Sequence, residues 1–333
     1  MLRLTSKITI TGLTDTYVFD FVTDLSITRT WDNLTQSGKM TIPQKIVWKN
    51  KEFIRGDNPI VKRGNNIKIE LGYNGVLNTY FDGYISKVVP ARPVQIEFED
   101  YMWVLKQATV NKYSKSNLTL NQLLSDLVTG IPFVAADVNI GTFQADKVNV
   151  VQVLDYIKQN YGLISYIRNG TLYCGLAYWL SDDAFGSGGL VKEADRPRTF
   201  QRTFTQNIID SKLEYNRLDD QKIQVKAVNI NDDNSRNELT VGDADGDVRT
   251  IFQYNVSEET LRSVALNYLD KFRFEGYTGS FTTFGDQYCD HGDTVRIVDP
   301  IIPDRNGFYL VKKVETTFGT SGFRNEIELD GQA

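Results

Sequence analysis

The N-terminal third of the chain alternates apolar and polar residues, which is the pattern of half-buried β-strands. The alternation is clean in Leu25–Trp31 and again in Ile67–Leu71. Asn74 and Gly75 follow the second run, and Asn-Gly between two β-rich segments favours a type I′ hairpin because both residues accept a positive φ. Short strands at this spacing predict a small, closed or nearly closed antiparallel barrel in residues 1–108.

Beyond residue 108 the apolar period lengthens, which indicates helices. Thr119 with Gln122, and Asn149 with Gln152, each place a capping residue three positions before a glutamine, so we expect helices to begin at both sites. Residues 109–198 are therefore expected to form a small α+β insert domain. Its last part, residues 182–198, is rich in glycine, serine and charge and is expected to be a linker.

Strand-like alternation resumes at residue 199 and continues to the end of the chain. It is interrupted by a polar, acidic loop expected between Val228 and Asp247, and by one long helix with Ser257 as its N-cap. Residues 199–333 are thus predicted to form a second β-barrel with a helical insertion at about 256–275. The expected fold is mainly β with an α+β insert: two small antiparallel β-barrels separated by a small α+β domain.

The overall charge is mild but unevenly distributed. The 333 residues are 41% hydrophobic and 24% charged, as in ordinary globular proteins. Lys plus Arg number 37 against 42 Asp plus Glu, and a net charge of −5 gives no electrostatic case for nucleic-acid binding by the whole protein. Residues 219–247 hold eight acids and three bases, so this one segment carries a net −5, equal to that of the whole chain.

The cysteines and the single histidine do not indicate a catalytic or metal site. Cys174 and Cys289 have no partner cysteine nearby, which argues against a disulfide or zinc framework. His291 is followed by Gly292 and Asp293, a pair that favours a tight turn, and its acidic neighbours are too close in sequence to converge on one ion. We therefore expect a turn at His291.

Other motifs that carry chemistry are missing from the sequence. The acidic run Asp243–Asp247 departs from a calcium-binding EF-hand loop, because its glycine is fourth rather than sixth and Tyr254 stands at the twelfth position. Walker, dinucleotide-binding, nucleophile-elbow and zinc-protease motifs are not found. We expect no cofactor, no metal and no enzymatic activity.

No targeting segment is evident either. Met1–Ile10 alternates apolar and polar residues without the continuous apolar core of a signal peptide, and no apolar stretch reaches the roughly 18 residues of a membrane span. Synthesis and assembly in the cytosol, without membrane insertion, are the expectation.

Several segments, taken in order, resemble the tail hub proteins of phages and related contractile injection machines. This family includes late control protein D and the hub half of type VI secretion spike proteins. The resemblance covers nearly the whole chain through short β patterns that carry no catalytic signature. The matching segments are Ile27–Asp32, Gly38–Pro43, Arg63–Ile69, Phe81–Ile85, Glu99–Tyr101, Val151–Ile157, Asn169–Leu172, Gly292–Ile297 and Gly307–Val314.

The resemblance implies a structural protein of the virion tail or baseplate, from a phage, a prophage or a phage-derived injection system. It implies a homotrimeric ring that adapts the sixfold tail tube to the threefold spike and lines the central channel. The implied partners are further copies of the chain, the tail tube protein, the central spike protein and other baseplate proteins, with DNA only as transient cargo in the channel.

Two alternatives stay open. A tail-tip protein of a non-contractile phage would share the fold, and a sheath gene nearby would argue against it. A secreted glycan-binding β-rich module would use the 17 Tyr, 18 Phe and 4 Trp for stacking, but it predicts a secretion signal.

The acidic segment suggests which residues would face a DNA channel. A wall that repels phosphate lets the polymer pass, whereas a wall that neutralises phosphates binds it. The candidate channel-facing residues are Asp219, Asp232, Asp243 and Asp247.

Overall fold

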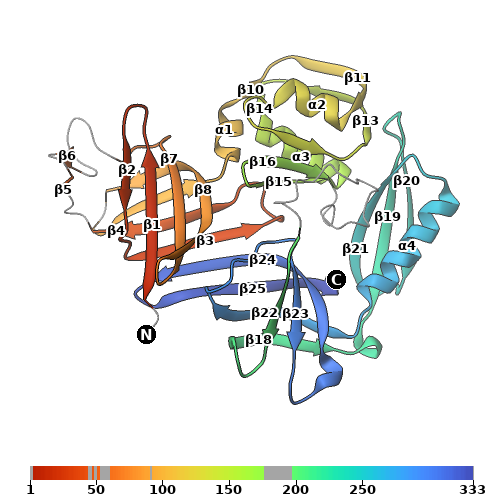
Figure 1. Ribbon diagram of the computed structural model, residues 1–333. Helices are drawn as coiled ribbons and strands as arrows, with labels where there is room; N and C mark the ends of the chain where they lie inside the picture. Colours follow the sequence, from red (N-terminus) through yellow and green to blue (C-terminus); the bar gives the residue numbers. More distant parts are fainter. Residues whose placement is uncertain are drawn as a thin grey trace.

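The computed structural model describes residues 3–43, 47–48, 51–52, 61–90, 92–175 and 197–332 (Figure 1). The linker expected at 182–198 lies outside the described residues except for its last two positions. Strands dominate the described chain, so the expectation of a mainly β fold with an α+β insert is confirmed. None of the described helices is long and apolar enough to cross a membrane.

The N-terminal β unit (strands β1 to β9) is an antiparallel sheet curled around an apolar core. Every second residue points into this core, as Ile27, Met40 and Ile96 do. Asn74 and Gly75 both have positive φ in the turn between β7 and β8, as the hairpin prediction requires. The strands are β1 (Leu4–Thr11), β2 (Thr16–Phe19), β3 (Asp24–Thr30), β4 (Ser37–Ile42), β7 (Asn66–Tyr73), β8 (Val76–Val89) and β9 (Val94–Glu99), with a separate small pair β5 (Val47–Trp48) and β6 (Lys51–Glu52).

The insert (α1 to β16) packs three helices and short strands around a core that also contains Val228 and Ile230 from further along the chain. Both predicted capping boxes are confirmed, because Thr119 and Asn149 each exchange hydrogen bonds with the glutamine three residues on. Gly162 ends α3 in the left-handed conformation. The elements are α1 (Met102–Gln107), β10 (Thr109–Val110), β11 (Tyr113–Thr119), α2 (Leu120–Leu127), β12 (Phe133–Ala135), β13 (Asn139–Ala145), β14 (Val148–Asn149), α3 (Val150–Tyr161), β15 (Ile164–Arg168) and β16 (Thr171–Gly175).

The C-terminal β unit continues the sheet of the N-terminal β unit. Strand β24 pairs antiparallel with β3, from Lys313 opposite Thr30 to Gly319 opposite Asp24. The resulting hydrogen-bonded sheet runs in the order β18-β22-β25-β24-β3-β4-β9-β8-β7-β1-β2. The elements of this unit are β17 (Thr199–Thr203), β18 (Ile208–Asn216), β22 (Gly276–Phe284), β23 (Thr294–Val298), the 3-10 turn η3 (Pro303–Arg305), β24 (Gly307–Gly319) and β25 (Gly322–Gln332).

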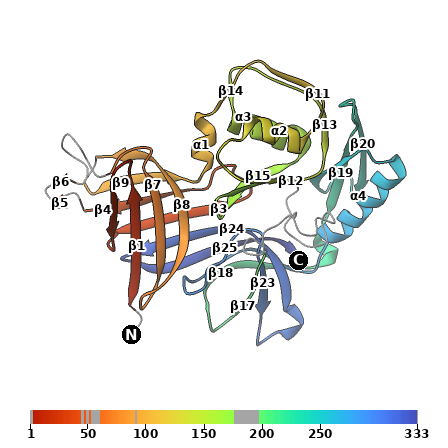
Figure 2. The same ribbon diagram turned by 45° about the horizontal axis from the view of Figure 1, so that its top comes forward.

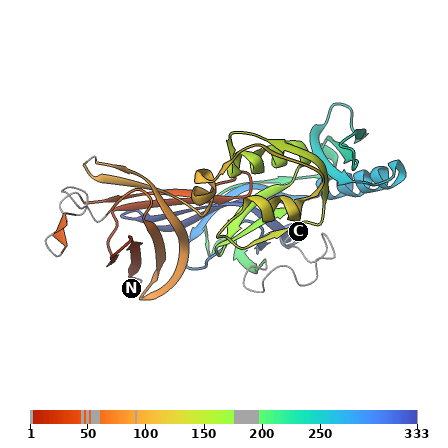
Figure 3. The ribbon, with the colours of Figure 1, turned by 90° about the horizontal axis from the view of Figure 1, so that it is seen from above.

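A fourth body, the outer unit, is inserted between β18 and β22. It contains the 3-10 turn η2 (Leu218–Asp220), β19 (Ile223–Ile230), β20 (Arg236–Gly242), β21 (Asp247–Tyr254) and α4 (Glu258–Phe272). Helix α4 begins after its predicted cap Ser257 and packs on one face of the sheet through Leu261, Ala265 and Leu269. The outer unit lies at the opposite end of the molecule from the N-terminal β unit (Figures 2 and 3).

The prediction of a loop between Val228 and Asp247 is wrong, because strand β20 lies within that segment. β20 is an edge strand of the order β20-β19-β21, and Val241 is its one buried residue. An edge strand with a single buried residue lacks the alternation of apolar and polar residues from which strands are predicted. The expected helix is likewise part of a separate sheet-and-helix unit, with a core of its own.

Candidate functional site: a polar face across both β units

One face of the continuous sheet is polar from the C-terminal β unit into the N-terminal β unit. Ile27 and Val314 are fully buried on the core side, whereas their neighbours Thr28 and Glu315 project to the other side and are partly exposed. We call this surface the polar face. It comprises Asp210, Lys212, Ser280, Thr282, Lys313, Glu315, Thr317, Arg324, Glu326, Glu328, Ser26, Thr28, Ser37, Lys39, Thr41, Gln95, Glu97 and Glu99.

The strand register makes these residues one surface rather than two. Glu315 of β24 lies opposite Thr28 of β3, and Thr28 lies opposite Ser37 of β4. On its other side Glu315 lies opposite Glu326 of β25. The Ser26 hydroxyl donates to Glu315 Oε1 at 3.5 Å across the seam. The alternation of each strand was readable from the sequence, but the seam that aligns them was not.

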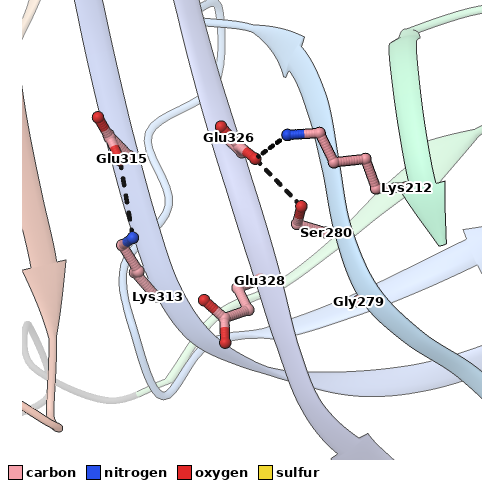
Figure 4. A pocket seen from close by; sticks show the side chains of 7 residues that line it. All are labelled: Lys212, Gly279, Ser280, Lys313, Glu315, Glu326 and Glu328. Atoms are coloured by element: carbon pink, nitrogen blue, oxygen red, sulfur yellow. Dashed lines mark hydrogen bonds and ion pairs between the residues drawn. The ribbon is translucent and has the colours of Figure 1, made fainter.

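Most carboxylates on this surface lie in ion pairs. Lys212 Nζ lies 3.1 Å from Glu326 Oε1, and Lys313 Nζ lies 3.7 Å from Glu315 Oε2 (Figure 4). The hydrogen bond from Lys212 lowers the pKa of Glu326, so that this carboxylate is ionised at neutral pH. Glu97 and Glu99 pair with Lys87 and Lys106 at the rim of the polar face, and Glu328 pairs with Lys312.

An open hollow of about 360 Å³ lies on the polar face (Figure 4). It is lined by Lys212, Gly279, Ser280, Lys313, Glu315, Glu326 and Glu328, a set without an apolar side chain. Small-molecule pockets are mostly apolar and enclose their ligands. The hollow therefore differs from a typical small-molecule pocket in both its polarity and its openness.

The turn at His291 is confirmed, and it is buried. Gly292 has a φ of 85°, and Asp293 N donates to Asp290 O at 3.2 Å. Burial lowers the pKa of His291 to about 4, so its ring is neutral at pH 7. Burial also raises the pKa of Cys174 and Cys289 to about 12, which keeps both thiols protonated and unreactive. In the described part of the chain no three His, Cys, Asp or Glu side chains come together as metal ligands.

This turn belongs to a buried polar junction that the sequence did not reveal. Arg168 of the insert lies 3.0 Å from Asp293 through Nη2, and its Nη1 donates to the His291 carbonyl at 3.2 Å. Gln36, in the loop after β3, donates through Nε2 to Ile167 O at 3.1 Å and lies 3.1 Å from His291 Nε2. The junction therefore joins the insert to both β units, which fixes the insert beside the sheet.

The four acidic candidates do not converge. Asp243 and Asp247 flank the turn between β20 and β21, and Asp219 lies in η2, which leads into the same end of β19. Asp232 follows β19 at its opposite end, where its carboxylate accepts a hydrogen bond from Asn255. The hydrogen bond from Arg273 lowers the pKa of Asp243, so the acidic charge there is partly compensated.

Comparison with known proteins gives matches of structure alone. No family model and no curated sequence matches the chain. The 43 kDa tail protein of prophage MuSo2 from Shewanella oneidensis is similar with a TM-score of 0.61 at 13% identity, covering 98% of this chain and 97% of that one. The tail protein of Neisseria meningitidis has a TM-score of 0.61 at 15% identity, with 98% and 96% covered.

A third match comes from a secretion machine. An Escherichia coli component of the type VI secretion system, described as structurally similar to bacteriophage T4 tail proteins, has a TM-score of 0.55 at 9% identity, covering 98% of this chain and 77% of that one. Identities this low establish a likeness of fold. Along nearly its whole length, the chain therefore has the fold of prophage tail proteins and of a tail-like type VI secretion component.

Proposed function

We propose that this chain is a structural hub protein in the tail or baseplate of a phage or of a phage-derived contractile injection system. Three copies form a ring that adapts the sixfold tail tube to the threefold spike, and the polar face lines its channel. The partners are the tube, spike and other baseplate proteins, with DNA as transient cargo. The protein acts without catalysis, in a tail assembled in the bacterial cytoplasm.

The observation that carries this proposal is the charge-paired polar face, which spans both β units of a fold shared with tail proteins. A DNA conduit must not bind its cargo, and the affinity for DNA grows with every phosphate that an unpaired cation neutralises. Lys212 and Lys313 of the polar face are held by carboxylates, so they present little net attraction to phosphate.

The four acidic candidates of the outer unit are the alternative lining of the channel. Asp219, Asp243 and Asp247 lie at one end of β19 and Asp232 at the other, and an eight-residue strand is about 26 Å long. The four side chains therefore lie in two places rather than in one cluster. We assign the channel lining to the polar face and keep the four acidic residues as the competing assignment.

Charge reversal distinguishes the two assignments. Glu315→Lys with Glu326→Lys adds unpaired cations to the polar face, and Asp232→Lys with Asp247→Lys adds the same charge to the outer unit. We expect both variants to assemble into tails, and the polar-face variant alone to deliver DNA more slowly, most strongly at low salt.

The measurement is genome delivery by purified particles, with electron microscopy to verify assembly. Slow DNA delivery by the outer-unit variant alone would instead assign the channel lining to the acidic residues. Particles that assemble and deliver without this protein would exclude a hub role.

A further inference from the structure

The side chain of Gln36 contacts two parts of the molecule at once, and the chemistry of its amide defines both contacts. Gln36 is 8% exposed, and its Nε2 lies 3.1 Å from Ile167 O of the insert and 3.1 Å from His291 Nε2 of the C-terminal β unit. A backbone carbonyl oxygen only accepts hydrogen bonds, so the group that faces Ile167 is the NH2 of the amide. This NH2 carries two hydrogens and donates one to each neighbour.

The second of these hydrogen bonds fixes the tautomer of His291. An amide NH2 does not accept, so His291 Nε2 is the acceptor and the ring hydrogen is on Nδ1. Among the described residues, Nδ1 has no hydrogen-bond partner. The rings of Tyr166 and Trp31 lie edge to face with the imidazole, with centroids 4.8 and 5.7 Å away. The site therefore accommodates a neutral ring with its hydrogen on Nδ1.

A protonated imidazole is incompatible with this arrangement. Both of its nitrogens carry hydrogens, so Nε2 would face the NH2 of Gln36 donor against donor. Turning the amide over would place its oxygen against Ile167 O, acceptor against acceptor. The ring of His291 is fully buried, so solvent does not compensate for either conflict. No orientation of the Gln36 amide satisfies both neighbours once the ring is protonated.

The charges around the ring do not offset this conflict. The charged side chains that act on the ring are Arg29 of β3, Arg168 of β15 and Asp290 of the turn itself. Asp293 lies 3.0 Å from Arg168, so two cations already face two carboxylates. Asp290 Oδ1 lies 4.0 Å from His291 Nε2, beyond hydrogen-bond distance. Burial and the two arginines outweigh Asp290 and lower the pKa of His291 to about 4.

The backbone of Gln36 is tied to the start of the insert. Gln36 N donates to Asp100 Oδ2 at 3.0 Å, and Asp100 N donates to Gln36 O at 3.0 Å. Asp100 Oδ1 also accepts from the N–H of Met102, the first residue of α1, at 3.0 Å. Gln36 therefore links the N-terminal β unit, the insert and the turn at His291.

We propose that Gln36 and His291 form a proton-sensitive latch, which is closed while the His291 ring is neutral and opens when the ring is protonated. Opening breaks the side-chain contacts of Gln36 with the insert and with the C-terminal β unit, while the ion pair of Arg168 with Asp293 remains. The pairing of β3 with β24 is not involved, so the sheet stays intact. This inference goes beyond the proposed function and does not rest on it, because it concerns contacts within one chain.

The other buried acids of the junction do not explain an opening at acid pH. Burial raises the pKa of Asp100 to about 7 and also raises that of Asp293, so the folded chain favours their protonated forms and gains relative stability as the pH falls. Burial acts to raise the pKa of Asp290 as well, but the two arginines outweigh it and keep that pKa below its usual value. Tyr288, which donates to Asp290 Oδ2 at 3.0 Å, has a raised pKa and stays neutral. His291 is thus the group whose protonation opposes the closed state between pH 6.5 and 4.5.

The tautomer can be measured directly, because His291 is the only histidine of the sequence. In NMR spectra of protein labelled at the histidine ring nitrogens, one set of signals distinguishes the two tautomers. We expect the hydrogen on Nδ1 at neutral pH, and loss of this pattern as the ring is protonated near pH 4. Gln36→Glu replaces the donor by an acceptor and should move the hydrogen to Nε2 and raise the pKa of the ring. Gln107→Glu, at an exposed position of α1, should change neither.

Hydrogen exchange measures the opening of the latch. Lowering the pKa from 6.5 to about 4 in the closed state corresponds to a roughly 60-fold larger open population at pH 4.5 than at pH 7. After correction for the intrinsic pH dependence of exchange, protection of the amides of Gln36 and of β15 should fall by this factor, and protection of β1 should not. His291→Gln leaves an acceptor for Gln36 but does not titrate, so this variant should stay closed over the same pH range.

Three results would overturn the proposal. A wild-type ring with its hydrogen on Nε2 at neutral pH would show that Gln36 does not donate to it. An equal loss of protection in His291→Gln would show that acidic residues rather than the histidine cause the opening. Junction amides that keep their full protection over this pH range would show that protonation opens nothing. The wild-type spectra and His291→Gln decide the matter even if Gln36→Glu does not fold.

Discussion

Replacing Arg168 by methionine would test whether the buried junction holds the insert against the C-terminal β unit. Arg168 Nη2 lies 3.0 Å from Asp293 Oδ1, and the two side chains are 5% and 1% exposed. Methionine fills much of the space of the arginine stem but carries no charge. The substitution therefore leaves the Asp293 carboxylate buried without its cation.

The magnitude follows from the burial of both partners. Removing one member of a buried ion pair costs about 3–5 kcal/mol. Asp293 would still accept hydrogen bonds from the backbone N–H groups of Arg198 at 3.0 Å and Asp290 at 2.9 Å, so we expect a cost of about 3 kcal/mol, near the lower end of that range. At about 1.4 kcal/mol for each factor of ten, local opening of the junction should become roughly 100-fold more frequent.

Hydrogen exchange followed by mass spectrometry is the suitable assay, because a chain with several cores need not unfold in one step. Amides of β15 and of the turn at residues 290–293 should exchange roughly 100-fold faster, whereas those of β1 should not change. Adding Asp293→Asn removes the orphaned charge and should restore much of the protection. Lys212→Met, which breaks an exposed ion pair, should change nothing measurable.

Two results would refute this reasoning. The first is a folded Arg168→Met variant whose junction amides exchange less than tenfold faster than those of the wild type. The second is a double variant that exchanges as fast as the single one, since that would show that lost packing rather than an unpaired charge causes the effect.

Three further predictions concern pH, backbone spacing and capping. The folded chain lowers the pKa of His291 from 6.5 to about 4, so the stabilising effect of keeping the ring neutral is fully present above pH 6.5. Up to roughly 3 kcal/mol of the free energy of unfolding should be lost as the pH falls towards 4, and the His291→Gln variant should not show this loss. A wild-type stability that does not change with pH in this window would contradict the prediction. Gly38→Ala places a Cβ atom 2.4 Å from the Phe98 ring and should lower the free energy of unfolding by about 1–3 kcal/mol in denaturant titrations. Ser37→Ala, on the exposed side of the same strand, should not lower it. Equal effects of the two substitutions would argue against the close approach at Gly38. Thr119→Ala removes a capping box and should cost about 1 kcal/mol by the same measurement, with Ser125→Ala as the exposed control, and an unaffected stability would show that packing alone sets the start of α2.

Features that depend on a few neighbouring residues were predictable from the sequence. The capping boxes at Thr119 and Asn149, the Asn74-Gly75 hairpin and the turn at His291 all form as predicted. In each case the deciding interaction joins residues no more than a few positions apart, so the local sequence contains all the groups involved. The failure at β20 has the complementary reason, because an edge strand with one buried residue is stabilised by its neighbour β19 and not by its own pattern.

The polar face and the buried junction depended on contacts between distant parts of the chain. Each strand showed which of its residues would be polar, but the pairing of β24 with β3 made those residues one face, and it joins positions nearly three hundred residues apart. The same holds for Arg168 and Asp293, whose charges are far apart in sequence and meet only when the insert packs beside the sheet. The alternation of apolar and polar residues determines which side of each strand faces solvent. Long-range hydrogen bonding and burial determine which of these solvent-facing sides join into one surface.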